Sequence, residues 1–178
     1  RVRATGDILG AYVNHWPSQN NVSSNRVQAA QALRSQIELD SQKYGNTFHA
    51  LALGDFNTIA SDSPHPFWSI QDLSWGLRLS AVNDMFENPS DFGIKLTPEQ
   101  KTEQSQLSHM PQGTYYFRNN WQHLDYFFVT PNLIDQVGME VQPLSFRIVA
   151  APHASSLFRL EGRSDEGEIV QKLFWAPR

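Results

Sequence analysis

The clearest pattern in the sequence is a short apolar run at residues 50–53, followed by a glycine and then by two polar residues, Asp55 and Asn57. An apolar run of this length predicts a buried strand, and Gly54 allows the backbone to turn where the run ends. We therefore predict a strand at 48–56. Because residues two apart on an extended chain point to the same side, we expect Asp55 and Asn57 to project together.

Two interpretations of Asp55 and Asn57 are open. A carboxylate can orient a water molecule or hold a metal ion, and an amide nitrogen can donate to a phosphoryl oxygen. The end of a strand is also where α/β folds tend to place ligands. Alternatively, Asp55 simply closes the strand with an Asx turn, in which its side chain accepts a hydrogen bond from the backbone two residues on. Residues 54–57 taken alone do not decide between them.

Two strands are expected before this run, at residues 1–5 and 8–15. Gly6 and Asp7 between them form a dipeptide that suits a tight hairpin turn. Pro17 cannot donate to a strand ladder, so it ends the second strand. His15 would then lie where that strand passes into a loop.

Residues from about 24 to 44 predict a helix, which Ser23 or Ser24 can cap and Gly45 can end. Its apolar face would consist of Val27, Ala30, Leu33 and Ile37. A hairpin, a helix and a strand in this order indicate a mixed α/β fold.

The pattern is weaker in the second half of the chain. The elements that we expect there are a short helix at 67–73, an undecided strand or loop at 77–85, a long loop at 87–112 with one helical turn, and strands at 113–117, 121–130, 137–149 and 169–175. A long loop inside a compact domain is often functional.

Composition limits the classes of protein that fit. The chain has 178 residues, enough for one domain with a real core, and a net charge of −4. That charge argues against binding nucleic acid through bulk positive charge, although a local basic groove remains open. There are no cysteines, which excludes disulfides and cysteine zinc sites but leaves the compartment open, a secreted or periplasmic location included. No apolar run approaches the roughly 20 residues of a membrane span.

Three segments become informative when taken together. They are Asn-His-Trp-Pro-Ser at 14–18, Gly-Asp-Phe-Asn at 54–57 and His-Leu-Asp-Tyr-Phe-Phe-Val at 123–129. In this order they resemble the endonuclease/exonuclease/phosphatase superfamily, the metal-dependent phosphoesterases similar to DNase I, and most closely its bacterial members with an Asn-His-Trp-Pro-Ser segment. The resemblance covers roughly residues 7–133. It implies a DNase I-like four-layer α/β sandwich, two β-sheets faced by helices, with the active site at one edge.

The resemblance also implies roles for four residues. His15 matches a histidine that contacts the phosphate or acts as an acid. Asp55 matches the aspartate that orients the attacking water or assists the leaving group, and Asn57 matches the asparagine that hydrogen-bonds the phosphate. Asp125 matches the aspartate that orients a catalytic histidine.

The sequence departs from the family pattern in two places. The asparagine and metal-binding glutamate of the family lie upstream of the hairpin and are not supplied here. The Ser-Asp-His segment that ends the family has only Ser-Asp-Glu, at 164–166, as a counterpart. We expect the true segment to lie beyond Arg178, with Asp165 as a remnant of it the less favoured alternative. Residues 1–178 would then be a single domain that forms an interior or C-terminal part of a longer one.

The function that this resemblance implies is hydrolysis of a phosphodiester or phosphomonoester by an activated water. A divalent ion, Mg²⁺ or Mn²⁺, would neutralise charge on the phosphoryl oxygen and lower the pKa of the water. We expect its main carboxylate ligand outside this chain. The substrate contains phosphate, and nucleic acid is one candidate. The alternatives are a non-catalytic binding or scaffold domain on the same fold, and a nuclease specifically, which the acidic balance disfavours.

Several other polar and aromatic residues are interpreted as structural. We expect Trp16 and Trp121 to pack rather than to bind substrate, while His123, two before Asp125, could share its side of the strand. The side chains expected in solvated positions are Arg26, Arg34, His65, His109 and His153.

The missing groups predict that the 178-residue chain by itself does not turn over phosphoesters, because it lacks both the metal carboxylate and the general base of the family. The measurement is hydrolysis of a panel of phosphomonoesters and phosphodiesters with Mg²⁺ or Mn²⁺. Metal-dependent turnover by this chain alone would show that the missing groups have been misplaced.

Overall fold

The computed structural model describes residues 1–82, 90, 95–107, 113–117, 120–135, 137–142 and 167–168. Within these ranges the helices and strands, in chain order, are β1 (Ile8–His15), α1 (Ser23–Tyr44), β2 (Phe48–Asp55), β3 (Ser80–Ala81), α3 (Pro98–Leu107), β4 (Tyr115–Phe117), β5 (Asn120–Gln122), β6 (Asp125–Val129) and β7 (Gly167–Glu168). Short 3-10 helices lie at η1 (Gly45–Thr47), η2 (Pro66–Ser69) and η4 (Pro131–Leu133). The predicted mixed α/β class is confirmed.

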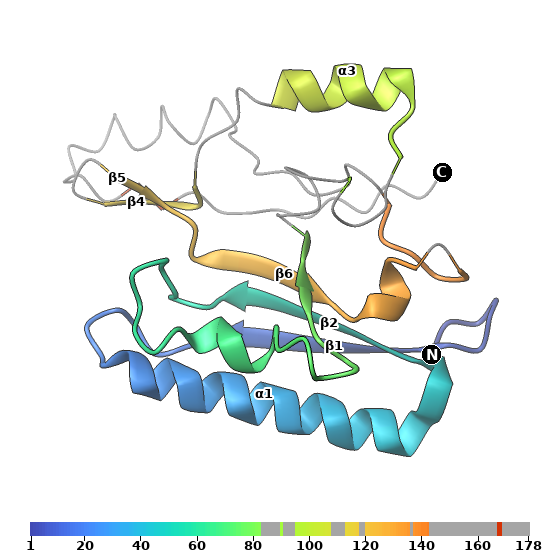
Figure 1. Ribbon diagram of the computed structural model, residues 1–178, viewed down its shortest axis with the longest axis horizontal. Coiled ribbons are helices and arrows are strands. Elements are labelled where there is room, and N and C mark those ends of the chain that lie inside the picture. The colour runs from blue at the N-terminus through green and yellow to red at the C-terminus, as the bar shows by residue number, and fades with distance from the viewer. Residues whose placement is uncertain are drawn as a thin grey trace.

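Among the described residues the larger sheet has four strands, in the order β1-β2-β6-β3. Strands β1 and β2 are parallel, whereas β6 is antiparallel to β2 and to β3. Helix α1 connects the two parallel strands and runs along one face of the sheet, as Figure 1 shows. A smaller sheet has the order β5-β4-β7. The mixed sheet therefore places β2 between a parallel and an antiparallel neighbour.

The two faces of the larger sheet pack into different apolar clusters. Phe48, Ala50 and Ala52 of β2 belong to the cluster that includes the buried side chains of α1. Leu51 and Leu53 pack instead on a second cluster with Phe127 and Val129 of β6. Alternate residues of a strand point to opposite faces. The odd-numbered residues of β1, β2 and β6 therefore face away from α1.

Helix α1 confirms the predicted helix, but neither of the two predicted serines caps it. The helix begins at Ser23 after an N-cap, Val22, that makes no side-chain capping hydrogen bond. The Ser23 hydroxyl donates instead to the Ser63 carbonyl oxygen, at 2.7 Å. At the other end Gly45, with φ 67°, closes the helix by donating its N–H to the Ser41 carbonyl, as predicted.

The expected N-terminal hairpin is wrong. Residues 1–5 form a turn rather than a strand, and Gly6 adopts φ 82° within it. The Gly6 N–H bonds the Val2 carbonyl at 2.9 Å, and the Val2 N–H bonds the Asp7 carbonyl at 2.7 Å. Since these groups are used within the turn, the segment does not run alongside β1.

Helix α3 is longer than the single turn that was predicted. The Thr97 hydroxyl accepts from the Gln100 N–H at 3.3 Å, and the Gln100 side chain accepts from the Thr97 N–H at 2.9 Å. This reciprocal pair is a capping box, which satisfies donors at the start of a helix. Thr97 and Gln100 at a spacing of three are the sequence signal for the helix that the loop interpretation overlooked.

The predicted strand at 121–130 is two strands in different sheets, because β5 pairs with β4 and β6 pairs with β2. The undecided segment at 77–85 contains β3, and the short helix expected at 67–73 is the 3-10 helix η2. No strand is found at 137–142, and the rest of the strand expected at 137–149 lies outside the described residues, as does the one at 169–175.

A hydrogen bond between β1 and α1 leads to a pH-dependent prediction. The Tyr12 hydroxyl donates to Asp40 Oδ2 at 2.7 Å, and this bond is the largest cause that holds the pKa of the Asp40 carboxyl below its ordinary value of 3.8. A carboxyl with a lowered pKa in the folded state adds stability above its unfolded pKa and loses it as the pH falls through the folded value.

We expect Tyr12→Phe to lower the free energy of unfolding by about 1 kcal/mol near neutral pH. The difference from the unaltered chain should shrink as the pH falls from about 4 through the lowered pKa of Asp40, because protonation removes the charge that the Tyr12 hydroxyl stabilises. Urea denaturation across this pH range measures it, and a difference that does not change with pH would contradict the assignment.

Candidate active site

Three of the four predicted site residues form one row across the larger sheet. His15 of β1 pairs with Asp55 of β2, and Asp55 pairs in turn with Asp125 of β6. Residues directly opposite on neighbouring strands project from the same face. The row lies on the face away from α1, where β1 and β2 end and β6 begins, the end of the sheet nearest β4 and β5 in Figure 1. The structure thus brings together three groups from distant stretches of chain.

The histidine and the central aspartate face each other at an open edge. His15 Nε2 lies 3.8 Å from Asp55 Oδ2, which is longer than a hydrogen bond. The His15 side chain is 81% exposed and the Asp55 side chain 35%. The histidine is therefore accessible to a ligand, whereas the carboxylate is partly enclosed.

Asp55 makes the Asx turn that the sequence left open, since its Oδ1 accepts the Asn57 N–H at 2.8 Å. Asn57 follows with φ 48°, a left-handed conformation that asparagine tolerates better than most residues. The prediction that Asp55 and Asn57 project together from an extended strand is therefore wrong. β2 ends at Asp55, and Asn57 is 8% exposed and donates its Nδ2 to the Trp16 carbonyl at 3.0 Å.

Backbone pairing continues past the ends of the strands and holds the site. The Trp16 N–H donates to the Asp55 carbonyl at 2.9 Å, and the Phe56 N–H donates to the Leu124 carbonyl at 2.8 Å. Gly54 is required here, because a Cβ at this position would lie 2.1 Å from the Asn14 carbonyl oxygen, and its φ is 127°. The strands can approach this closely only with glycine.

Trp16 packs as predicted. Its side chain is 4% exposed, and its ring meets those of Phe56 and Phe67 edge-on at 4.7 and 5.9 Å. Its Nε1 donates to Asn14 Oδ1 at 3.1 Å. The tryptophan therefore anchors the loop after β1 in the core beneath the site.

Thr114 supports Asp125 and was missed in the sequence. Its buried hydroxyl accepts from the Leu124 N–H at 3.1 Å and from the Asp125 N–H at 3.2 Å. The same residue donates its own N–H to the Gln122 carbonyl at 2.9 Å. A threonine beside a glycine in a turn carries no pattern that could have identified this role.

His65 was predicted to be solvated, but its side chain is half-buried. Its Nδ1 accepts the Phe67 N–H at 3.3 Å and caps the 3-10 helix η2, and burial lowers the pKa of the imidazole. Of the other histidines, His123 has a buried Nδ1 that finds no hydrogen-bond partner within the described ranges. His109, His153 and Asp165 lie outside the described residues.

No metal-binding cluster is found in the part of the chain that the structure describes: none of its histidines and acids form a group of three or more suited to a metal ion. Asp55 and Asp125 are neighbours in the row, but on their own these two carboxylates do not make such a site. The described residues therefore do not fit the expected ion without further ligands.

The fold is that of an α/β protein, and the row places two aspartates and a histidine at the ends of three neighbouring strands. The sequence model of the Endonuclease/Exonuclease/phosphatase family matches residues 3–146, and the chain belongs to this family. The α/β architecture is consistent with the DNase I-like fold that the resemblance implied, incomplete in the residues described. No curated protein matches the chain.

One solved structure to which the chain is similar is an endonuclease/exonuclease/phosphatase family protein from Bacteroides thetaiotaomicron. The two are 14% identical, with a TM-score of 0.41, and the match covers 72% of this chain and 38% of that one. The chain thus spans well under half of the length of this structure. Among the described helices of the chain, none is long and apolar enough to cross a membrane.

The buried amide of Asn57 generates a stability prediction. Asn57→Gly keeps the left-handed conformation but removes the partner of a buried carbonyl, which costs about 1–3 kcal/mol. Asn57→Ala removes the same partner and adds roughly 1 kcal/mol of backbone strain. We therefore expect stability to fall in the order Asn, Gly, Ala, as measured by urea denaturation. An alanine variant as stable as the glycine variant would contradict the backbone conformation.

Proposed function

We propose that the protein containing this chain hydrolyses a phosphoester by attack of an activated water, with His15, Asp55 and Asp125 at the reacting group. The observation that supports this most strongly is that the three residues lie directly opposite one another on neighbouring strands, at the end of the sheet. Membership of the endonuclease/exonuclease/phosphatase family supports the same class of reaction.

Asp55 is suited to accept a proton from the attacking water. One carboxylate oxygen, Oδ1, is fixed by the Asn57 N–H, and the other faces the His15 ring. A carboxylate held in this way can accept a proton with its second oxygen without losing its orientation. In this proposal the exposed imidazole of His15 donates to an oxygen of the phosphate.

Asn57 contributes in two ways in this proposal. Its backbone N–H orients Asp55, and one hydrogen of its side-chain amide goes to the Trp16 carbonyl. A carboxamide nitrogen carries two hydrogens. The second hydrogen is the one that we propose for the phosphoryl oxygen.

A divalent ion, Mg²⁺ or Mn²⁺, remains part of the proposal, with its main carboxylate ligand outside the described residues. When bound, such an ion would supply charge neutralisation at the phosphoryl group. The roles given above to His15, Asp55 and Asn57 do not depend on its geometry.

The test uses the longest natural chain that contains these residues, assayed with Mg²⁺ and Mn²⁺ on phosphomonoesters, phosphodiesters and nucleic acid. We expect Asp55→Asn and Asp125→Asn to lower kcat/KM by about 10²–10⁴-fold, the range typical of lost acid–base groups. Glu99→Gln, on the exposed surface of α3, is the matched charge-removing control and should be unchanged.

Two results would count against the proposal. Absence of turnover by the unaltered protein across the whole panel would favour a binding or scaffold domain. Full activity in the Asp55 and Asp125 variants would instead show that these residues take no part in the reaction.

A further inference from the structure

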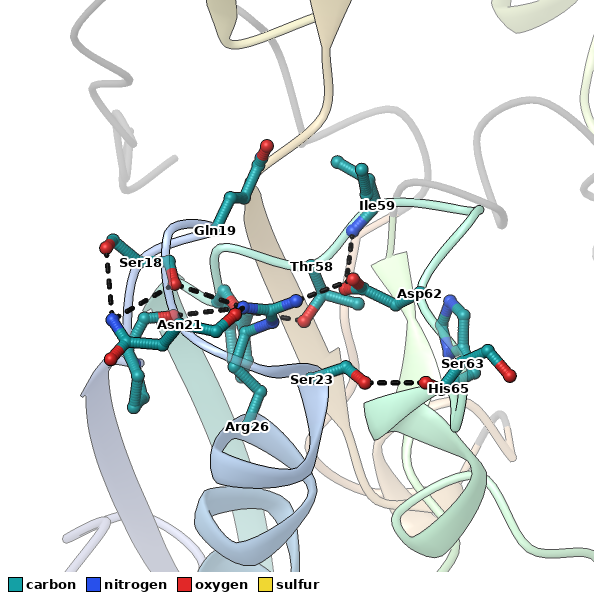
Figure 2. Close-up of polar contacts among 12 residues, drawn as sticks. Ser18, Gln19, Asn21, Ser23, Arg26, Thr58, Ile59, Asp62, Ser63 and His65 are labelled. Atoms are coloured by element: carbon teal, nitrogen blue, oxygen red, sulfur yellow. Dashed lines mark hydrogen bonds and ion pairs between the residues drawn. The ribbon is translucent and has the colours of Figure 1, made fainter.

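Arg26 is buried, contrary to the expectation that it is solvated. Its side chain is 2% exposed and contacts four groups. Nη1 donates to the carbonyls of Ser18, Asn21 and Pro17, at 3.1, 3.4 and 3.5 Å, and Nη2 donates to Asp62 Oδ1 at 2.5 Å. Figure 2 shows the guanidinium reaching from the start of α1 into the space between two loops. The burial follows from these partners rather than from the helical pattern.

The two loops that Arg26 joins are those that follow the site strands. Residues 17–21 continue from His15 at the end of β1, and residues 58–63 continue from Asn57 after β2. Asp62 itself closes a turn, since its Oδ2 accepts the Ile59 N–H at 3.2 Å and its N–H donates to the Ile59 carbonyl at 3.0 Å. One side chain thus bonds the backbone of the first loop and the carboxylate that shapes the second.

Stability alone does not account for a charge in this place. A guanidinium stays protonated when buried, and a buried ion pair is often no more stable than apolar side chains of the same volume. Within the described part of the chain, Arg26 Nε is buried without a hydrogen-bond partner, which adds a further cost. What the pair provides is geometry, because the planar fork fixes the directions of several acceptors at once.

The contact reaches the site through a short series of hydrogen bonds. The Trp16 carbonyl, next to the first loop, accepts from the Asn57 side chain, and the Asn57 N–H fixes the Asp55 carboxylate. Ser23, at the start of the same helix, adds a second link through its bond to the Ser63 carbonyl. A shift of either loop would therefore move Asn57 relative to Asp55.

We propose that Arg26 and Asp62 are positioning residues, which hold loops 17–21 and 58–63 so that His15, Asp55 and Asn57 surround a single phosphate group. The kinetic part of this inference rests on the proposed function. The structural part does not, since it concerns only whether Arg26 and Asp62 hold the two loops in one conformation.

Arg34 offers a matched control on the same helix. It also bonds a backbone carbonyl and an aspartate, through Nη1 to Ser69 at 2.9 Å and to Asp72 Oδ2 at 3.4 Å. Its side chain is 28% exposed, and its Nε also bonds Glu38 on the same helix. Ser69 lies in η2 and Asp72 just beyond it, and neither belongs to loop 17–21 or loop 58–63. Arg34→Lys therefore removes a similar fork that holds neither of the two loops that follow the site strands.

The first measurement compares Arg26→Lys and Asp62→Asn with Arg34→Lys in the longest natural chain. These changes keep size, and the lysine keeps the charge, so folding is retained as far as possible. We expect the Arg26 and Asp62 variants to lower kcat by about 10²-fold with KM changed only a few-fold, as misplacement of reacting groups does. Arg34→Lys should stay close to the unaltered protein. Unchanged kcat in all three variants, measured well below their unfolding midpoints, would overturn the kinetic part.

The second measurement is amide hydrogen exchange, which requires no activity. We expect Arg26→Lys and Asp62→Asn to speed exchange at Asn21, Ile59 and Asp62, while the amides of β2 keep their protection. Unchanged exchange in both loops, or equal acceleration throughout the larger sheet, would overturn the inference. If the unaltered protein proves inactive on every phosphoester, the proposed function fails and this exchange measurement alone decides on the loops.

Discussion

The pairing of β2 with a strand on each side is the constraint on which the rest of the structure depends. Its parallel register with β1 and its antiparallel register with β6 both pass through Asp55. A register shift of one residue would turn every side chain of a strand to the other face. The apolar residues enforce the observed register, because Leu51 and Leu53 have one cluster to fill and Ala50 and Ala52 the other. Packing of the sheet therefore decides which polar side chains meet at its edge.

The loops have a separate role. The sheet determines the face from which the site side chains project, and the loops determine how those side chains are oriented. Asp55 is central in the row but takes its direction from Asn57, which in turn holds the Trp16 carbonyl. Thr114 holds the backbone at the start of β6. The bond between Asn57 and Trp16 joins residues 41 apart and the two Thr114 bonds span 10 and 11 residues, whereas the bond between Asp55 and Asn57 is local. The exposed His15 side chain thus lies at strand ends whose surrounding backbone is buried and hydrogen-bonded.

Sequence patterns predicted those parts of the molecule in which neighbouring residues determine the outcome. The bounds of β1, β2 and α1 follow from apolar runs and from Gly45. The row itself was suggested by family resemblance, not by periodicity, which cannot show that Asp55 and Asp125 share a register. Asn57 was misplaced because a spacing of two implies one face only while the chain stays extended. Arg26 was misplaced because its partner, Asp62, comes from a later loop, so that no pattern within the helix shows its burial.

The central claim is that Asp55 is the direct neighbour of both His15 and Asp125. Proton–proton contacts measured by nuclear magnetic resonance along the backbone test this most directly. The account predicts cross-strand contacts that pair residue 55 with residue 125, and contacts that place residue 15 beside residue 55. Contacts that pair residue 55 with residue 124 or 126 instead would turn the Asp125 carboxylate to the face of α1 and contradict the account.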